Sequence, residues 1–155
     1  MARKGNRRNF WDSGLTVTEM MVTIFISAVL MGIAVPNFLS WLSMFRLDDA
    51  ARQIATDLQL ARMRAISQNT ANTATFDAAN GTYTFTLGTD SRDLKVLYPG
   101  ITIAVAPANP GFNSRGTSTN AGVITITLSN ASGTQRFVCV TVVGRVNVKN
   151  SGGCP

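Results

Sequence analysis

Residues 14–45 read GLTVTEMMVTIFISAVLMGIAVPNFLSWLSMF, and this stretch decides the fold. No charged residue occurs from Met20 to Phe45. The run is longer than the roughly 20 apolar residues that a helix needs to cross a bilayer. It is preceded by a basic segment that contains Arg3, Lys4, Arg7 and Arg8. Because clustered Lys and Arg beside a span stay on the cytoplasmic side, the pattern predicts one membrane span with a cytoplasmic N-terminus.

Beyond the apolar run, the sequence continues as an amphipathic helix. Apolar residues recur every three or four positions, at Leu47, Ala51, Ile54, Leu58, Ala61 and Ala65. No Gly or Pro interrupts residues 37–69. Asp48 and Arg52 have the spacing of an i,i+4 ion pair. We therefore expect one helix over about residues 15–68, apolar all round in its first half and packed by one face on a globular domain in its second half.

After residue 71 the periodicity changes to two, with many β-branched and aromatic residues. The candidate strands are residues 73–77, 82–87, 94–98, 101–106, 123–128, 135–143 and 145–149. Asn80-Gly81 predicts a hairpin between the first two. Residues 107–120 form a long polar loop in which Phe112 and Arg115 are candidate contact residues, with a mobile surface loop as the alternative. Short strands and tight turns predict an α+β fold, with antiparallel β-sheets packed on the long helix.

The first part of the chain resembles the class III signal of type IV pilins and pseudopilins. The resemblance rests on Gly14, on Glu19 five positions later, and on residues 34–38, AVPNF, which match the family's usual motif. It implies that a prepilin peptidase cuts after Gly14 and methylates the new N-terminus at Leu15. The sequence departs from the family pattern at Leu15, where Phe or Met is commoner, and at residues 16–18, TVT in place of TLI. An ordinary secretory signal would have a shorter apolar core followed by a small-x-small cleavage site.

This resemblance implies three segments and an assembly mechanism. Residues 1–14 would be a leader that is removed, residues 15–45 a transmembrane or filament-core half-helix, and residues 46–155 a periplasmic or extracellular domain. A carboxylate at membrane depth is costly unless it is paired, so Glu19 is expected to meet the α-amino group of a neighbouring subunit. The alternative is a helix-start carboxylate near the membrane interface. Pro36 removes a helix hydrogen bond, so we expect a kink or local melting there when the helix enters a filament.

The amphipathic half of the helix narrows the resemblance to one branch of the superfamily. Ala50-Ala51, residues 58–62 (LQLAR) and residues 64–66 (RAI) are similar to the AA…LQ.AR..AI pattern of GspH-type pseudopilins and FimT/FimU-like minor pilins. Taken alone, Arg62 and Arg64 indicate a solvated helix face. The branch implies a minor structural subunit of a type IV pilus or a type II secretion pseudopilus in the bacterial inner membrane. Its partners would be other pilins in a helical filament. A major pilin is an alternative.

Near the C-terminus, the VVGRV of residues 142–146 resembles a strand of the same branch. DNA-binding minor pilins of the FimT type carry a GRxR motif here, whereas this chain has Gly144-Arg145-Val146-Asn147 and lacks the second arginine. Lys149 and Arg136 are candidates to compensate for it. The second hypothesis is therefore a tip pilin that captures DNA during uptake through Arg145, Lys149 and Arg136. A few such phosphate contacts would give only salt-sensitive, non-specific affinity.

The two cysteines, Cys139 and Cys154, are expected to form a disulfide if the domain is exported to an oxidising compartment. Two buried free thiols are the alternative. Histidine is absent, which removes the commonest general base and the commonest metal ligand. The carboxylates are scattered, and no phosphate-binding glycine loop occurs. The sequence therefore predicts no catalytic site, no metal and no cofactor, and an enzyme is the least favoured class.

Overall fold

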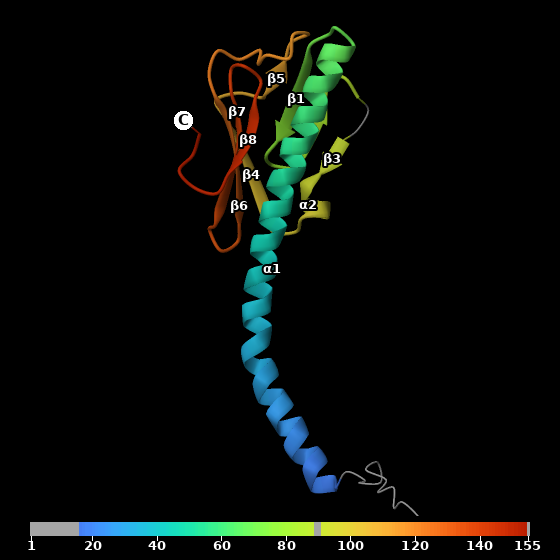
Figure 1. Cartoon of the computed structure of the whole chain (residues 1–155), viewed down its shortest axis with the longest axis vertical. Coiled ribbons are helices and arrows are strands. Elements are labelled where there is room, and N and C mark those ends of the chain that lie inside the picture. Colours follow the sequence, from blue (N-terminus) through green and yellow to red (C-terminus); the bar gives the residue numbers. More distant parts are fainter. Residues whose placement is uncertain (1–15, 89–90, 155) are drawn as a thin grey trace, which may run out of the picture. The chain divides into compact units, whose positions relative to one another are not determined.

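The structure is a computed structural model that describes residues 16–88 and 91–154 (Figure 1). Helix α1 extends over Val17–Ser67 without interruption, which confirms the predicted continuous helix. Pro36 lies inside α1 and does not end it. A kink at Pro36 in an assembled filament stays a prediction. The predicted cut between Gly14 and Leu15 lies outside the described residues.

The chain divides into two compact units, residues 1–39 and residues 40–155. In the first unit, every described residue of α1 is exposed. This part of α1 is long and apolar enough to cross a membrane, and the most apolar window of the helix has none of its surface buried. It therefore has the surface of a helix made for an apolar environment.

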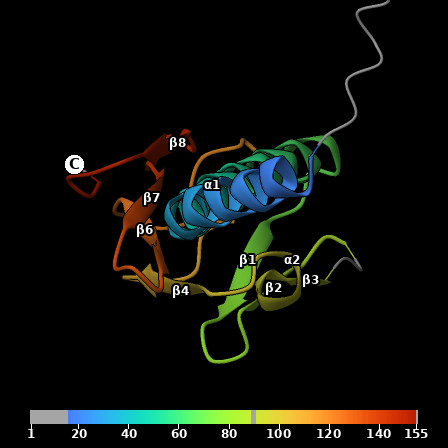
Figure 2. The same cartoon turned by 90° about the horizontal axis from the view of Figure 1, so that it is seen from below.

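The second unit holds the rest of α1 and two four-stranded sheets. The first sheet has the order β3 (Ser91–Asp93), β2 (Thr82–Phe85), β1 (Asn72–Asp77) and β5 (Gly111–Phe112). The second has the order β4 (Ile101–Ala106), β6 (Ile124–Asn130), β7 (Gln135–Val140) and β8 (Val146–Lys149). All neighbouring strands are antiparallel. The predicted α+β class is confirmed, and Figure 2 shows β6 to β8 toward one side of α1 and β1 to β3 toward the other.

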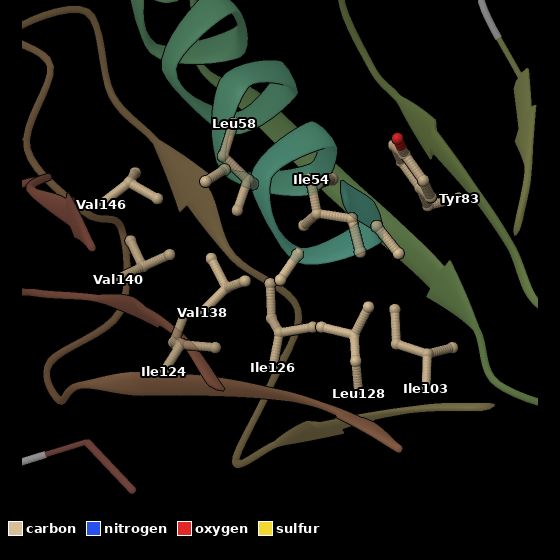
Figure 3. Packing of buried hydrophobic residues seen from close by; sticks show 14 of the residues in the cluster. Ile54, Leu58, Tyr83, Ile103, Ile124, Ile126, Leu128, Val138, Val140 and Val146 are labelled. Carbon is tan, nitrogen blue, oxygen red and sulfur yellow. The ribbon is translucent and has the colours of Figure 1, made fainter. Parts of the chain in front are cut away.

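The core lies between α1 and the two sheets (Figure 3). Each residue of the predicted helix stripe is buried, and Ala50 and Ala55 join it. From β6, Ile124, Ile126 and Leu128 are fully buried and meet this stripe. Because so many helix positions in the core are alanine, the backbone of α1 can approach both sheets closely.

The predicted hairpin at Asn80-Gly81 is confirmed. The last pair of residues before the turn is Asp77 of β1 and Thr82 of β2, which lie opposite each other. Gly81 has a φ of 69° and donates its N–H to the Asp77 carbonyl at 2.8 Å. A glycine adopts this left-handed conformation without the steric cost that a side chain brings.

The predicted strand over residues 94–98 is wrong. Residues Leu94–Leu97 form a short helix, α2, because the Asp93 side chain accepts hydrogen bonds from the N–H groups of Lys95 and Val96 and caps a helical turn. The predicted loop over residues 107–120 contains the short strand β5. Phe112 on β5 is fully buried, so it is a core residue and not the surface contact that the sequence indicated, whereas Arg115 is exposed.

A buried tyrosine–carboxylate pair joins α1 to the first sheet. The Tyr83 hydroxyl donates to Asp57 Oδ2 at 2.5 Å, and Gln53 donates to the other carboxylate oxygen at 3.1 Å. Tyr83 and Asp57 are 1% and 7% exposed. Burial, and then the Asp57 carboxylate, raise the pKa of Tyr83 far above its usual value. The phenol therefore stays protonated and acts as a donor.

We expect Tyr83→Phe to lower the free energy of unfolding by about 1.5 kcal/mol, because it removes a buried hydrogen bond to a charged group. The matched control is Tyr98→Phe, since the Tyr98 hydroxyl makes no hydrogen bond within residues 16–88 and 91–154 and its removal should cost less than about 0.5 kcal/mol. Denaturant titration of both variants measures the difference. Equal losses would contradict the assigned role of the pair.

Candidate functional site

The start of α1 is fixed by a cap. Thr16 Oγ1 accepts a hydrogen bond from the Glu19 N–H at 3.2 Å, and the Thr16 carbonyl accepts one from the Met20 N–H at 3.1 Å. This is N-cap geometry, and Thr16 with Glu19 has the spacing of a capping box. Glu19 lies in the first turn, where the helix dipole favours a carboxylate. The capping residue, Thr16, is the position at which the TVT of residues 16–18 agrees with the family's usual TLI.

The apolar half of α1 exposes large side chains on all sides. Those more than half exposed include Met20, Met21, Ile24, Phe25, Leu30, Met31, Ile33, Phe38 and Leu39. Soluble monomers rarely expose a continuous apolar surface of this kind. Such a surface is stable only against lipid or against other apolar helices.

At the other end of α1, two arginines hold loops against the helix. Arg62 Nε donates to the Gly116 carbonyl at 2.7 Å, and Arg64 Nη1 donates to the Leu87 carbonyl at 3.3 Å. Both side chains are half-buried. The predicted solvated face at Arg62 and Arg64 is therefore wrong, because each guanidinium has a backbone acceptor on a loop far along the chain.

The turn between β7 and β8 packs directly on one of these loops. The Gly144 N–H donates to the Thr141 carbonyl at 2.8 Å, and the Ser118 N–H donates to the Val142 carbonyl at 2.9 Å. Gly144 is buried, and a side chain there would overlap the Gly116 carbonyl and approach Arg62. The glycine of the sequence motif therefore has a packing reason: only a residue without a Cβ fits between the turn and the loop.

The three basic residues proposed for DNA contact do not all lie on the surface of the domain. Arg145 is exposed and Lys149 is half-buried. Arg136 is 6% exposed, and its Nε donates to Asp48 Oδ1 on α1 at 2.5 Å. This burial does not favour a DNA-contact role for Arg136. The predicted Asp48–Arg52 pair is also wrong, because the Asp48 carboxylate is bound by Arg136.

The predicted disulfide between Cys139 and Cys154 is confirmed, with a Cα–Cα distance of 5.6 Å. Cys139 lies on β7 opposite Asn147 of β8. It therefore alternates with Val138 and Val140, which face the core. The disulfide fixes the chain that follows β8 to the outer face of the second sheet.

Within residues 16–88 and 91–154, no group of three or more Cys, Asp or Glu side chains is placed to hold a metal ion. The buried carboxylate of Asp57 is occupied by Tyr83 and Gln53 and has a packing role. The functional features are thus an apolar half-helix that is exposed and a domain packed on the second half of α1, in which the Cys139–Cys154 disulfide joins the segment after β8 to β7. A long N-terminal helix of this type, packed on antiparallel sheets, defines a pilin-like protein.

The comparisons with known proteins agree with this class. The family model described as Type II transport protein GspH matches residues 50–144, more than half of the chain, and the chain belongs to this family. No curated protein matches the chain. The matched region runs from Ala50, within the buried part of α1, to Gly144 of the β7–β8 turn.

Two kinds of solved structure share the fold. The type IV minor pilin FimU of Pseudomonas aeruginosa is similar with a TM-score of 0.61 and 17% sequence identity, over 74% of this chain and 96% of that one. The minor pseudopilin EpsH of the Vibrio cholerae Type 2 Secretion System is similar with a TM-score of 0.55 and 17% identity, over 68% of this chain and 97% of that one. These similarities establish the pilin-like fold.

Proposed function

We propose that this protein is a structural subunit, a minor pilin or pseudopilin, of a type IV pilus or a type II secretion pseudopilus. The observation that carries the proposal is the single helix α1, which is exposed and apolar in its first half and forms the core of a folded domain in its second half. Such a helix can be held in a membrane and can also pack against copies of itself in a filament. The family membership supports the same role.

The proposed mechanism begins in the inner membrane, with residues 1–14 in the cytoplasm and the domain in the periplasm. A prepilin peptidase cuts after Gly14 and methylates Leu15. The subunit then moves sideways into the filament, where Glu19 neutralises the α-amino group of a neighbour. Pairing removes the cost of a lone carboxylate in an apolar core.

The test of processing is the intact mass and N-terminal sequence of the protein recovered from membranes and from sheared filaments. We expect a chain that starts at N-methylated Leu15. Its abundance in the filament fraction separates a minor from a major subunit. A chain that keeps residues 1–14 and never enters the filament fraction would overturn the proposal.

We expect Glu19→Gln to reduce incorporation into filaments about tenfold, which corresponds to about 1.4 kcal/mol of lost pairing. Glutamine keeps the size of the side chain and its place in the helix but removes the charge. Glu19→Asp, which retains the charge, is the matched control and should keep most of the incorporation. Quantitative immunoblotting of sheared filaments against membranes measures both, and equal incorporation of the wild type and Glu19→Gln would contradict the pairing.

A further inference from the structure

The second sheet ends in an open edge. β8 is the last strand in the order β4-β6-β7-β8, and its outer edge has no neighbouring strand among the described residues. The N–H and C=O groups on such an edge are a template for another extended chain. The disulfide joins Cys154 to Cys139 of β7, the strand next to β8 on the inner side.

The face of β8 that points toward α1 is only partly covered. Val148 lies opposite Val138 on β7, so the two side chains share the face toward α1. Val138 is fully buried, whereas Val148 remains 37% exposed. A sheet that continued for one more strand would cover Val148.

A pocket of about 380 Å³ lies where that strand would place its inward side chains. It is lined by Asp48 and Arg52 of α1 and by Val148 and Asn150 at the end of β8. The space is larger than one apolar side chain needs and is bounded by α1 on one side and the edge strand on the other.

The charges around the edge are positive on balance. Asp48 is already bound by Arg136, whereas Arg52 is exposed and has no ion pair within residues 16–88 and 91–154. Lys149 lies on the outer face of β8, opposite Phe137. A partner strand with carboxylates would meet both cations. A second copy of β8 would bring a second Arg52 and Lys149 into the same interface, and like charges there are unfavourable.

We propose that the open edge of β8 binds an extended, acidic segment of a partner protein, which adds a fifth strand to the second sheet. Its inward side chains are apolar next to Val148 and carboxylate next to Arg52. Main-chain hydrogen bonds supply affinity, and the pocket supplies specificity. This binding site does not depend on the proposed processing or on assembly through Glu19.

The test uses the full chain in detergent micelles and two fluorescent eight-residue peptides, Val-Thr-Glu-Thr repeated twice and Val-Thr-Lys-Thr repeated twice. Each peptide places Val and the charged residue on the same face of an extended strand. We expect fluorescence anisotropy to show the acidic peptide binding about tenfold more tightly than the basic one. Hydrogen exchange of the complex should show new protection in β8. Equal affinities for the two peptides, no binding of the acidic peptide, or hydrogen exchange in β8 that the peptide does not slow would overturn the proposal.

The discriminating variant is Arg52→Glu. It should weaken binding of the acidic peptide about tenfold and strengthen binding of the basic one, because it reverses the charge at the pocket. The matched control is Arg46→Glu, an equal charge change at an exposed position of α1 that does not line the pocket. Circular dichroism verifies that both variants are folded. An equal loss for both variants, or protection of β8 that rises with protein concentration and without peptide, would overturn the proposal in favour of general charge attraction or self-association.

Discussion

Gly144→Ala is expected to lower the free energy of unfolding by about 3 kcal/mol or more, whereas Gly133→Ala should cost only about 1 kcal/mol. The two glycines have nearly the same backbone conformation, with φ values of 78° and 77°. They differ in their surroundings. A Cβ at Gly133 meets nothing within 4 Å, but a Cβ at Gly144 overlaps the backbone oxygen of Gly116. The difference between the variants therefore measures the steric contact separately from the conformational cost.

Urea titration of the full chain in detergent, followed by circular dichroism, measures both variants against the wild type. The overlap at Gly144 is with backbone, so it is relieved only if the β7–β8 turn moves away from the loop that Arg62 holds. We therefore also expect faster hydrogen exchange at the Ser118 amide, which donates to Val142 in that turn. Similar losses for the two variants would show that the turn and the loop separate at little cost.

The helix and most strands could be predicted because their signals are local. The apolar run and the three-or-four spacing of the stripe predict that α1 is one long helix, which face it buries and where it meets the domain. The hairpin at Gly81 likewise depends on a dipeptide that favours the required backbone conformation. The disulfide could be expected because the chain has only two cysteines.

The errors come from competing or distant interactions. Residues 94–98 have the apolar content of a strand, but the preceding Asp93 caps a helical turn. In so short a segment, the hydrogen bonds of the cap outweigh the strand preference of the residues. Arg62 and Arg136 looked like surface cations because their acceptors lie 54 and 88 positions away in the sequence. β5 is too short to give a periodic signal, and its burial depends on pairing with β1.

The second large effect on stability is expected at Asp48 and Arg136, which are far apart in the sequence but form an ion pair. We expect Asp48→Ala to lower the free energy of unfolding by about 3 kcal/mol, because it leaves a buried guanidinium without its counter-charge. The side chain of Arg136 is 7% exposed and that of Asp48 is 37% exposed. The arginine cannot regain water without opening the contact between α1 and β7. Denaturant titration of the full chain in detergent measures the loss.

Replacing Arg136 in place of Asp48 should lower the free energy of unfolding much less. Arg136→Met replaces the buried cation by an apolar side chain of similar length, and the partly exposed Asp48 carboxylate can be solvated. We therefore expect a loss within about 1 kcal/mol. The double variant Asp48→Ala with Arg136→Met should be more stable than Asp48→Ala alone, because it removes the stranded charge. If Arg136→Met costs as much as Asp48→Ala, the attraction between the two groups outweighs the burial of the guanidinium, and the pair is a net source of stability that joins α1 to the second sheet.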